Sequence, residues 1–576
     1  MSKVPAPQRA GAAARLASPL LAGLLAVGLA FLSQAWGLLR QDPAAAASAL
    51  LSGAACMGLL CLALRRPALR ALAQDPDAVF WAGLLAGLAL FVVLVWVQQS
   101  ALVGGRRWFW LEDDAMVSMR YAARLAAGQG LTWTDGARVE GYSNFAWTLA
   151  MALVHRIGVP QAQASACVLA LNAACLAWLA CGVRRCAVRF GAGAMEAALA
   201  GLACALSYDL VDGALSGLEM AAVAAVTAAS LAQGLDAEAE GLDWPWTAYA
   251  LAGCLPLLRA DGALPAGLLL LAGLRRRERR DQGRQAWGGW TAAVAATALA
   301  LGPGLLHEAF RVAYYGQWAP NTYTLKADGW PGKYADGAFK VAHDLARYPL
   351  VLMAALAGMR VPAWRPWLLG LLALAAYCAW TGADYYFFLR FFAAGFPLLF
   401  ALAFASASRA AQSRRLPTAA AGALLLLASA NAAWAFPALL GSGWEAAQER
   451  LQVALQMKRS VPAGDSVASS WAGSFFYFSG LPGVDLLGKC DPVVARARPD
   501  PSLGGCGHNK MDLGHSLGQL KPAWVLIQVP SWSAADRAYL IPAWDQRLAA
   551  HPLFLLHCDA GMRQISDHWA LCRCRW

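Results

Sequence analysis

The chain has 576 residues, of which 59% are hydrophobic and only 14% are charged, and its formal net charge is +12. An ordinary soluble domain has about 25% charged residues, so several soluble domains of this total length would need a more polar surface. The composition also excludes disordered, fibrous and small disulfide-stabilised proteins, which leaves a polytopic membrane protein.

The basic residues lie in short clusters between apolar runs, at residues 65–70, 184–189, 275–284 and 409–415. This placement is typical of the positive-inside rule, and it puts all four clusters in the cytoplasm if the N-terminus is cytoplasmic. The acidic connection 236–243 is an exception that the rule does not explain. Nucleic-acid binding is disfavoured, because no basic stripe with interleaved aromatic residues is present.

Hydropathy and the basic clusters together predict an α-helical protein with about 13 membrane-spanning helices. The predicted spans lie near residues 17–39, 45–64, 79–103, 162–183, 193–210, 216–234, 245–259, 261–274, 287–307, 347–360, 364–381, 392–408 and 416–437. Lys3, Arg9 and Arg15 precede the first run, which is too long for a signal sequence and is interpreted as an uncleaved anchor.

The spans divide the chain into three parts: an N-terminal tail with two extra helices at 1–78, a transmembrane module at 79–437, and a soluble tail at 438–576. The topology places the segments 104–160, 308–346, 382–391 and the soluble tail outside. Within that tail we expect an amphipathic helix at 445–458 and short strands at 467–469, 524–529 and 553–556. The tail is therefore predicted to be an extracytoplasmic α/β domain.

Five cysteines fall in the predicted tail: Cys490, Cys506, Cys558, Cys572 and Cys574. An oxidising compartment permits disulfides. We predict one between Cys490 and Cys506, and another between Cys558 and either Cys572 or Cys574. A zinc site is the alternative, although a single Cys-x-Cys with scattered histidines supports it weakly.

Three adjacent acidic residues, Glu112, Asp113 and Asp114, stand where the third span ends and a helix begins. One aspartate there can simply cap the helix N-terminus. Capping does not explain three carboxylates together, because such a cluster repels itself unless a cation, an arginine or a proton relieves it. Clustered carboxylates at an apolar boundary suit a general base or a metal ligand.

Further charged residues interrupt apolar surroundings in three places, at 259–262, 314–326 and 382–390. Ionisable groups at such depth are costly and indicate function. The tyrosines have an alternative role in an interfacial aromatic belt, and Arg390 and Lys326 can snorkel to the membrane surface. The sharper interpretation makes Arg259 or Lys326 a ligand for a lipid phosphate.

These segments resemble a known family. Asp113-Asp-Ala-Met-Val-Ser-Met-Arg-Tyr121, followed by Gly128-Gln-Gly-Leu and Arg138-Val-Glu-Gly-Tyr-Ser-Asn144, closely resembles the first outer loop of the actinobacterial terminal arabinofuranosyltransferases. The resemblance continues in the same order, from about residue 79 to 530. It includes Ser216-Gly-Leu-Glu219, Arg259-Ala-Asp-Gly262, Tyr315–Lys326, Gly382–Arg390, Trp471–Gly488 and Gly507-His-Asn-Lys510.

The resemblance implies a GT-C fold and an inverting transfer of one sugar from a polyprenyl-phosphate donor. The expected acceptor is a cell-envelope glycan or glycoconjugate, on the extracytoplasmic face of a bacterial plasma (inner) membrane. The chain departs from the family in two extra spans before the family region and in Arg-Ala-Asp-Gly, which replaces the expected Arg-Pro-Asp/Glu-Gly. Relatives of this type also occur outside arabinan-making bacteria, so the resemblance leaves the sugar open, with arabinofuranose as one candidate. The alternatives are a ligase for whole lipid-linked glycans (an oligosaccharyltransferase) and, less favoured, a lipid-sugar flippase.

The resemblance also suggests roles for individual residues. Asp113 is the expected base and Asp114 orients the acceptor or the base. The phosphate is expected to contact Arg259 and Lys326, in a pocket shaped by Tyr315 and Asn321. Sugar contacts or loop-holding pairs are expected from Glu140, Glu219, Asp384 and Arg390. The sequence leaves the requirement for a divalent cation undecided, since it shows no complete set of metal ligands.

Overall fold

The computed structural model describes residues 74–281, 287–327, 332–382, 389–414, 443–505, 507–530 and 541–576. The predicted spans 17–39, 45–64 and 416–437 lie outside the described residues, as do Asp384 and Cys506.

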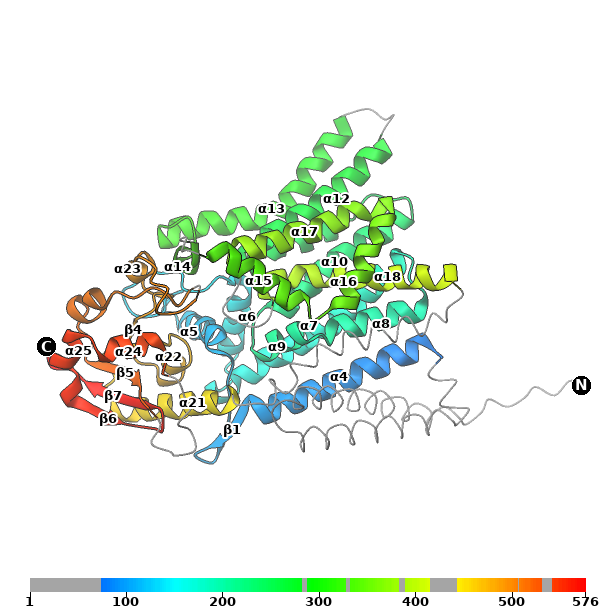
Figure 1. The fold of residues 1–576 in the computed structure, drawn as a ribbon. Helices are drawn as coiled ribbons and strands as arrows, with labels where there is room; N and C mark the ends of the chain where they lie inside the picture. Colours follow the sequence, from blue (N-terminus) through cyan, green and yellow to red (C-terminus); the bar gives the residue numbers. More distant parts are fainter. Residues whose placement is uncertain are drawn as a thin grey trace, which may run out of the picture.

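Helices form a long bundle, and the tail lies beyond one end of it (Figure 1). Five helices are long and apolar enough to cross a membrane, or up to seven if each of two bent pairs counts as one span. The five cover Pro76–Gln98 (α4), Gln161–Arg189 (α7), Met220–Ala239 (α10), Trp290–Tyr315 of α13 (Trp287–Tyr315), and Arg390–Gln412, which contains most of α18 (Phe396–Arg414).

The bent pairs join α8 (Ala194–Ala205) to α9 (Tyr208–Leu215) at 42°, and the α16 (Pro349–Ala357) segment to the α17 (Arg365–Trp380) segment at 118°. The shorter helices α11 (Trp246–Leu258) and α12 (Ala263–Asp281) complete the bundle. Each predicted span between residues 79 and 408 thus overlaps a helix or a bent pair, while the total of about 13 spans stays a prediction.

One predicted boundary is wrong. The apolar run 79–103 does not continue as a helix, because α4 ends at Gln98 and Ser100–Val103 (β1) pairs antiparallel with Arg106–Phe109 (β2). The turn between the strands is Gly104–Gly105, and both residues have positive φ, 60° and 75°. Two consecutive left-handed residues are what a tight hairpin turn requires, and glycine adopts them without steric cost.

Small residues let the bundle helices approach closely. A side chain at Gly201 of α8 would meet the carbonyl oxygen of Ala180 at 2.4 Å, and one at Gly182 of α7 would meet the Cβ of Ala228 at 2.8 Å. Glycine and alanine at such contacts let backbones pack tightly where apolar lipid gives no hydrophobic advantage to burial.

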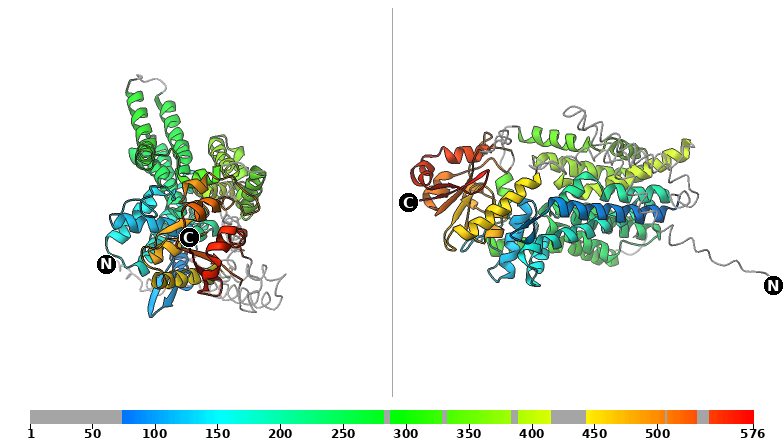
Figure 2. Two further views of the ribbon diagram at one scale, coloured as in Figure 1. Left: turned by 90° about the vertical axis from the view of Figure 1, so that its left-hand side faces the viewer. Right: turned by 90° about the horizontal axis from the view of Figure 1, so that it is seen from below.

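Short elements form the end of the bundle that faces the tail. They are the β1–β2 hairpin, α5 (Asp113–Ala126), α6 (Phe145–Arg156), α14 (Asn321–Ala327) and α15 (Lys333–Leu345). Figure 2 shows the arrangement from below, with the bundle helices side by side and the tail beyond their ends. Segments far apart in the sequence therefore meet at this end of the bundle.

The tail contains a five-stranded mixed sheet in the order β4-β3-β5-β7-β6. Its strands are β3 (Val467–Ser469), β4 (Gly483–Asp485), β5 (Trp524–Gln528), β6 (Met562–Gln564) and β7 (Trp569–Arg573). The strands β4, β3 and β5 run parallel, and β7 is antiparallel to both β5 and β6. The predicted strands at 467–469 and 524–529 are thus confirmed.

Both faces of the central strand β5 are buried, which explains its continuous apolar run. Val525 and Ile527 pack in a separate tail core, whereas Leu526 on the opposite face belongs to the main core. The tail helices are α21 (Gly443–Ser460), α22 (Ser474–Ser479), α23 (Pro492–Ala495), α24 (Ala543–Ala549) and α25 (Pro552–His557). The expected amphipathic helix is α21.

The predicted strand at 553–556 is wrong, because these residues form α25. Pro552 stands in its first turn and the His551 side chain accepts the Leu553 N–H at 3.3 Å. Proline at the first position and a capped N–H are helix-start signals that outweigh a short apolar run.

Cysteine pairing confirms one of the two predicted disulfides. Cys558 and Cys574 form a disulfide, and Cys572 is a buried free thiol. Cys490 is also a free thiol. It is buried against α5, where the Tyr121 hydroxyl lies 3.8 Å from its sulfur, and its predicted partner Cys506 lies outside the described residues.

Candidate active site

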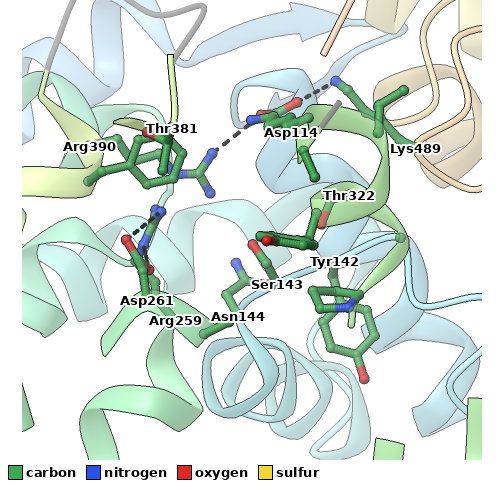
Figure 3. Close-up of a pocket in the computed structure, with 18 of the residues that line it drawn as sticks. Asp114, Tyr142, Ser143, Asn144, Arg259, Asp261, Thr322, Thr381, Arg390 and Lys489 are labelled. Atoms are coloured by element: carbon green, nitrogen blue, oxygen red, sulfur yellow. Dashed lines mark hydrogen bonds and ion pairs between the residues drawn. The ribbon is translucent and has the colours of Figure 1, made fainter. Parts of the chain in front are cut away.

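A cavity opens where the bundle end meets the tail, with about 1120 Å³ of empty space when its mouth is included. Figure 3 shows how segments from distant parts of the chain converge on it. Its walls come from α5, residues 141–144, residues 259–261, α14, α15, the end of α17, residues 390–391 and the tail residue Lys489.

Positive charge predominates in this cavity. Among the described residues, five basic side chains line it: Arg259, Lys326, Lys333, Arg390 and Lys489. The acidic residues in the same lining are Asp114 and Asp261. Hydroxyl and aromatic groups fill much of the remaining wall, including Tyr142, Ser143, Thr322, Tyr323, Tyr377, Trp380 and Thr381. The excess of cations suits an anionic ligand such as a phosphate group.

Asp114 projects from the first turn of α5 into the cavity and joins two cations (Figure 3). One oxygen forms an ion pair with Lys489 of the tail, and the other lies 3.3 Å from Arg390 Nη1. Burial alone would raise the pKa of Asp114, but the charges of Lys489 and Arg390 outweigh it and hold the pKa well below its usual value. This carboxylate is therefore charged and paired with two cations.

Asp113 points elsewhere. Its side chain is 2% exposed and does not line the cavity. Its two oxygens accept the N–H groups of Gly473 (3.2 Å) and Ser474 (2.8 Å), at the start of α22. The carboxylate thus caps a helix, as one interpretation expected, but the helix is in the tail and not its own. The geometry favours Asp114 over Asp113 as the candidate base.

Arg120, two turns further along α5, holds the other end of α22. Its guanidinium donates to the carbonyl oxygens of Phe476 (3.0 Å) and Leu481 (3.1 Å). A carboxylate at the N-terminus and a cation at the C-terminus both complement the unpaired backbone groups of α22. The helix α5 therefore docks the tail with one face and presents Asp114 to the cavity with another.

The expected repulsion within the acidic cluster is relieved by separate partners. Glu112 lies 3.8 Å from Arg450 of α21, while Asp113 and Asp114 have the contacts described above. Among the described residues, no group of three or more His, Cys, Asp or Glu side chains is arranged to hold a metal ion.

A buried ion network supports the cavity from behind. Glu219 accepts from Arg259 Nη1 at 2.7 Å, from Arg390 Nη2 at 3.1 Å and from Asn144 Nδ2 at 2.9 Å. Arg259 also contacts Asp261 at 2.9 Å. Glu219 therefore fixes both arginines where they line the cavity, which is the loop-holding role that was one of its two predicted roles.

The helix α14 brings a lysine to the cavity and also contacts the tail. Lys326 lines the cavity, with its ammonium 5.7 Å from the centre of the Phe391 ring. Lys333 donates to the carbonyl of Ala327 at 3.0 Å and so caps the end of α14. Asn321 at its start donates to the carbonyls of Gly488 (2.8 Å) and Lys489 (3.0 Å) in the tail.

Two other predicted site residues support the outer loop. Tyr315 donates to the carbonyl of Leu131 at 3.0 Å, and its hydroxyl lies 3.1 Å from that of Tyr142, which lines the cavity. Glu140 pairs with Arg311 at 2.5 Å. Neither Tyr315 nor Glu140 is part of the cavity lining.

The structure thus divides the predicted site into lining and support. The lining contains Asp114, Arg259, Lys326 and Arg390, and the supporting residues are Asp113, Glu140, Glu219, Tyr315 and Asn321. Sequence reasoning missed Lys489 and Lys333. A signal existed for Lys489, which directly follows the motif that ends at Gly488, whereas Lys333 has no recognisable motif around it.

Comparisons with known proteins agree with this architecture. The chain is 29% identical over 292 residues to the terminal β-(1→2)-arabinofuranosyltransferase of Mycobacterium tuberculosis, an alignment that covers 45% of this chain and 43% of the relative. The crystal structure of ArnT from Cupriavidus metallidurans bound to undecaprenyl phosphate superposes with a TM-score of 0.53 at 15% identity. That match covers 85% of this chain and 97% of ArnT.

The chain has the GT-C fold. The apo structure of the same ArnT gives a TM-score of 0.51 at 14% identity, covering 86% of this chain and 98% of that one. A family profile described as a domain of unknown function (DUF8728) matches residues 441–570, which contain the tail sheet up to β7. The chain aligns with less than half the length of its mycobacterial relative.

Proposed function

We propose that this chain is an inverting membrane glycosyltransferase that moves a single sugar from a polyprenyl-phosphate donor to a hydroxyl of a cell-envelope glycan or glycoconjugate. The observation that carries the proposal is the cation-rich cavity at the junction of bundle and tail, into which the carboxylate of Asp114 projects. A lipid phosphate needs cations near a membrane boundary, and an acceptor hydroxyl needs a base beside them.

The chemistry follows from the groups in the cavity. Asp114 takes the proton of the acceptor hydroxyl, whose oxygen forms a bond to the anomeric carbon of the sugar. The bond from that carbon to the phosphate oxygen breaks on the opposite side, and the polyprenyl phosphate leaves with the electron pair. Arg259, Arg390 and Lys326 stabilise the charge that develops on the phosphate. Attack opposite one leaving group inverts the anomeric carbon.

The distribution of basic residues supports an extracytoplasmic cavity. The helix α12 starts two residues after Asp261, and its arginines at 275–277 and 279 follow at least 12 residues after the helix start, about 18 Å further along at 1.5 Å per residue. Arg409 of α18 follows the cavity residue Phe391 by 18 positions in the chain. Because basic clusters favour the cytoplasm, the cavity and tail are proposed to face outward from a bacterial inner membrane.

An uncharged sugar fits the wall chemistry. Ser143, Thr322 and Tyr323 supply hydroxyl groups beside the cations. Both carboxylates of the lining already have ion-pair partners, since Asp261 pairs with Arg259 and Asp114 with Arg390. Arabinofuranose is the first sugar to test, because the mycobacterial relative is named an arabinofuranosyltransferase.

The test is a transfer assay on the purified full chain in lipid nanodiscs, with polyprenyl-phosphate [¹⁴C]arabinofuranose and envelope glycan as acceptor. We expect the glycan mass to increase by one sugar while polyprenyl phosphate is released. Arg259→Gln should abolish most of this transfer, and the exposed tail variant Arg563→Gln is the matched control. Transfer of a whole preassembled glycan would instead indicate a ligase, and failure with every monosaccharide donor would reject the proposal.

A further inference from the structure

The backbone around Lys489 is held by hydrogen bonds, whereas its side chain is long and flexible. Asp485, which ends β4, accepts the N–H groups of Gly488 (3.2 Å) and Cys490 (2.7 Å). From the opposite side, Asn321 of α14 donates to the carbonyls of Gly488 and Lys489. The backbone is therefore fixed by both the tail and the bundle, while the four-carbon stem of a lysine can still swing its ammonium.

The two cations on Asp114 differ in how firmly they are anchored. Arg390 is held behind the cavity by Glu219 at 3.1 Å, so its position does not depend on Asp114. Lys489 reaches across from the tail, and its side chain is 15% exposed within a cavity that also contains Arg259 and Lys326. Of the two, Lys489 is the cation that can leave Asp114 without breaking a second buried ion pair.

We propose that Lys489 is a donor-phosphate ligand supplied by the tail, and that donor binding moves its ammonium from Asp114 to the phosphate and so frees Asp114 to act as the base. This proposal rests on the proposed function, because it concerns the phosphate and the base of the same site.

The exchange is reasonable on electrostatic grounds. A phosphate entering among five cations offers several acceptor oxygens to an ammonium group, whereas Asp114 offers one oxygen to each of its partners. Once Lys489 has moved, Asp114 keeps only the contact with Arg390, and its charged form is stabilised less. A carboxylate with weaker cation contacts is a stronger base, so activation follows donor binding.

The ion pair is not needed to hold the tail in place. Asp113 and Arg120 already bind the two ends of α22. Lys510 of the tail, which is 1% exposed, donates to the carbonyls of Thr324 (3.2 Å) and Ala495 (2.6 Å) and so ties α14 to the tail. A further tether at Lys489 would add little, which favours a ligand-binding role.

The test is a double-mutant cycle on equilibrium binding of undecaprenyl phosphate to the full chain in nanodiscs. Lys489→Met should weaken binding about tenfold, the scale of one charge-assisted hydrogen bond. Asp114→Asn should tighten binding about fivefold to tenfold, because phosphate then no longer competes with a carboxylate for Lys489. In the Lys489→Met background the same Asp114→Asn change should gain less than about twofold.

Two variants control for charge and folding. Lys458→Met removes an exposed lysine from α21 and should leave affinity unchanged. Lys489→Arg keeps the charge and should bind within about threefold of the unmodified chain.

The proposal is overturned if Asp114→Asn weakens binding, if its gain is the same with and without Lys489, or if Lys489→Met lowers only the unfolding temperature. Binding needs no turnover. If the chain passes these binding tests but transfers no sugar, the proposed transferase function is refuted, while the role of Lys489 in phosphate binding stands.

Discussion

Two adjacent carboxylates on α5 face different parts of the molecule. Successive residues of an α-helix point about 100° apart, so Asp113 reaches the tail while Asp114 reaches the cavity. The sequence predicted that this pair matters, but it could not tell which member faces the substrate. That choice depends on the rotation of α5, which contacts with α22 determine, and no local pattern reports those contacts.

Arg259 gives a prediction at this scale. Arg259→Ala removes a cavity cation that Glu219 holds at 2.7 Å. We expect binding of undecaprenyl phosphate to weaken by about 1.5–3 kcal/mol, the range for hydrogen bonds to charged groups. Equilibrium titration in nanodiscs measures this, with Arg563→Ala on β6 as the control. Unchanged affinity would remove Arg259 from the phosphate site.

Asp545 gives a pH prediction. Burial raises the pKa of Asp545 from 3.8 to about 7, although the hydrogen bond from Ser470 lowers it. Between these values the folded tail retains a proton that the unfolded chain has lost, so stability falls as pH rises through this window.

The Asn side chain of Asp545→Asn stays neutral at all these pH values. The β5 amides of the variant should therefore be better protected from hydrogen exchange than those of the unmodified chain, and this difference should be larger at pH 8 than at pH 5. The exposed Asp559→Asn is the control. Equal protection at both pH values would contradict the assignment.

At the level of elements, long apolar helices were predictable and short elements were not. Runs such as 162–183 are fixed by composition alone, and α7 covers Gln161–Arg189 as expected. The run 553–556 suits a strand or a helix equally, and the nearby Pro552 decided for the helix α25. The hairpin β1–β2 was hidden by its apolar first strand, although Gly104–Gly105 is a recognisable turn signal.

The packing of α22 on α5 gives a prediction about secondary-structure elements. Arg120→Met leaves the carbonyls of Phe476 and Leu481 without their donor in a buried setting, at a cost of about 1–3 kcal/mol each. Hydrogen exchange of α22 should therefore accelerate about tenfold or more in the full chain. Arg156→Met, at the exposed end of α6, should leave α22 unaffected. Unaltered exchange in Arg120→Met would mean that α22 is held by other contacts.

At the scale of the whole molecule, the cavity exists only because the bundle and the tail meet. Asp114 and Arg390 come from the first and Lys489 from the second, more than 370 positions along the chain from Asp114. Sequence order places these residues in separate segments, and in advance the resemblance to a known family linked only Asp114 and Arg390. Lys489 was missed because its role depends on a tertiary contact between the tail and the bundle, and local sequence patterns do not predict that contact.

Membrane sidedness is the prediction at this scale. Alkaline phosphatase fused after about residue 145 or about residue 460 should be active, and fusion after about residue 280 should be inactive, because basic clusters stay in the cytoplasm. Enzyme activity in whole cells, normalised to fusion protein level, measures this. An inactive fusion after about residue 460 would place the tail in the cytoplasm and contradict the orientation.

The most direct measurement of the central claim is single-turnover sugar transfer by Asp114→Asn and Asp113→Asn, each saturated with donor. If Asp114 is the base, Asp114→Asn should slow transfer by about 100-fold or more, since general base catalysis contributes about 10²–10⁴. Asp113→Asn loses one of the two oxygens that accept the N–H groups of Gly473 and Ser474, so it should lower the folded fraction. It should slow transfer by the folded protein less than about tenfold, because Asp113 does not line the cavity. Near-normal transfer by Asp114→Asn, with transfer abolished in folded Asp113→Asn, would contradict the account.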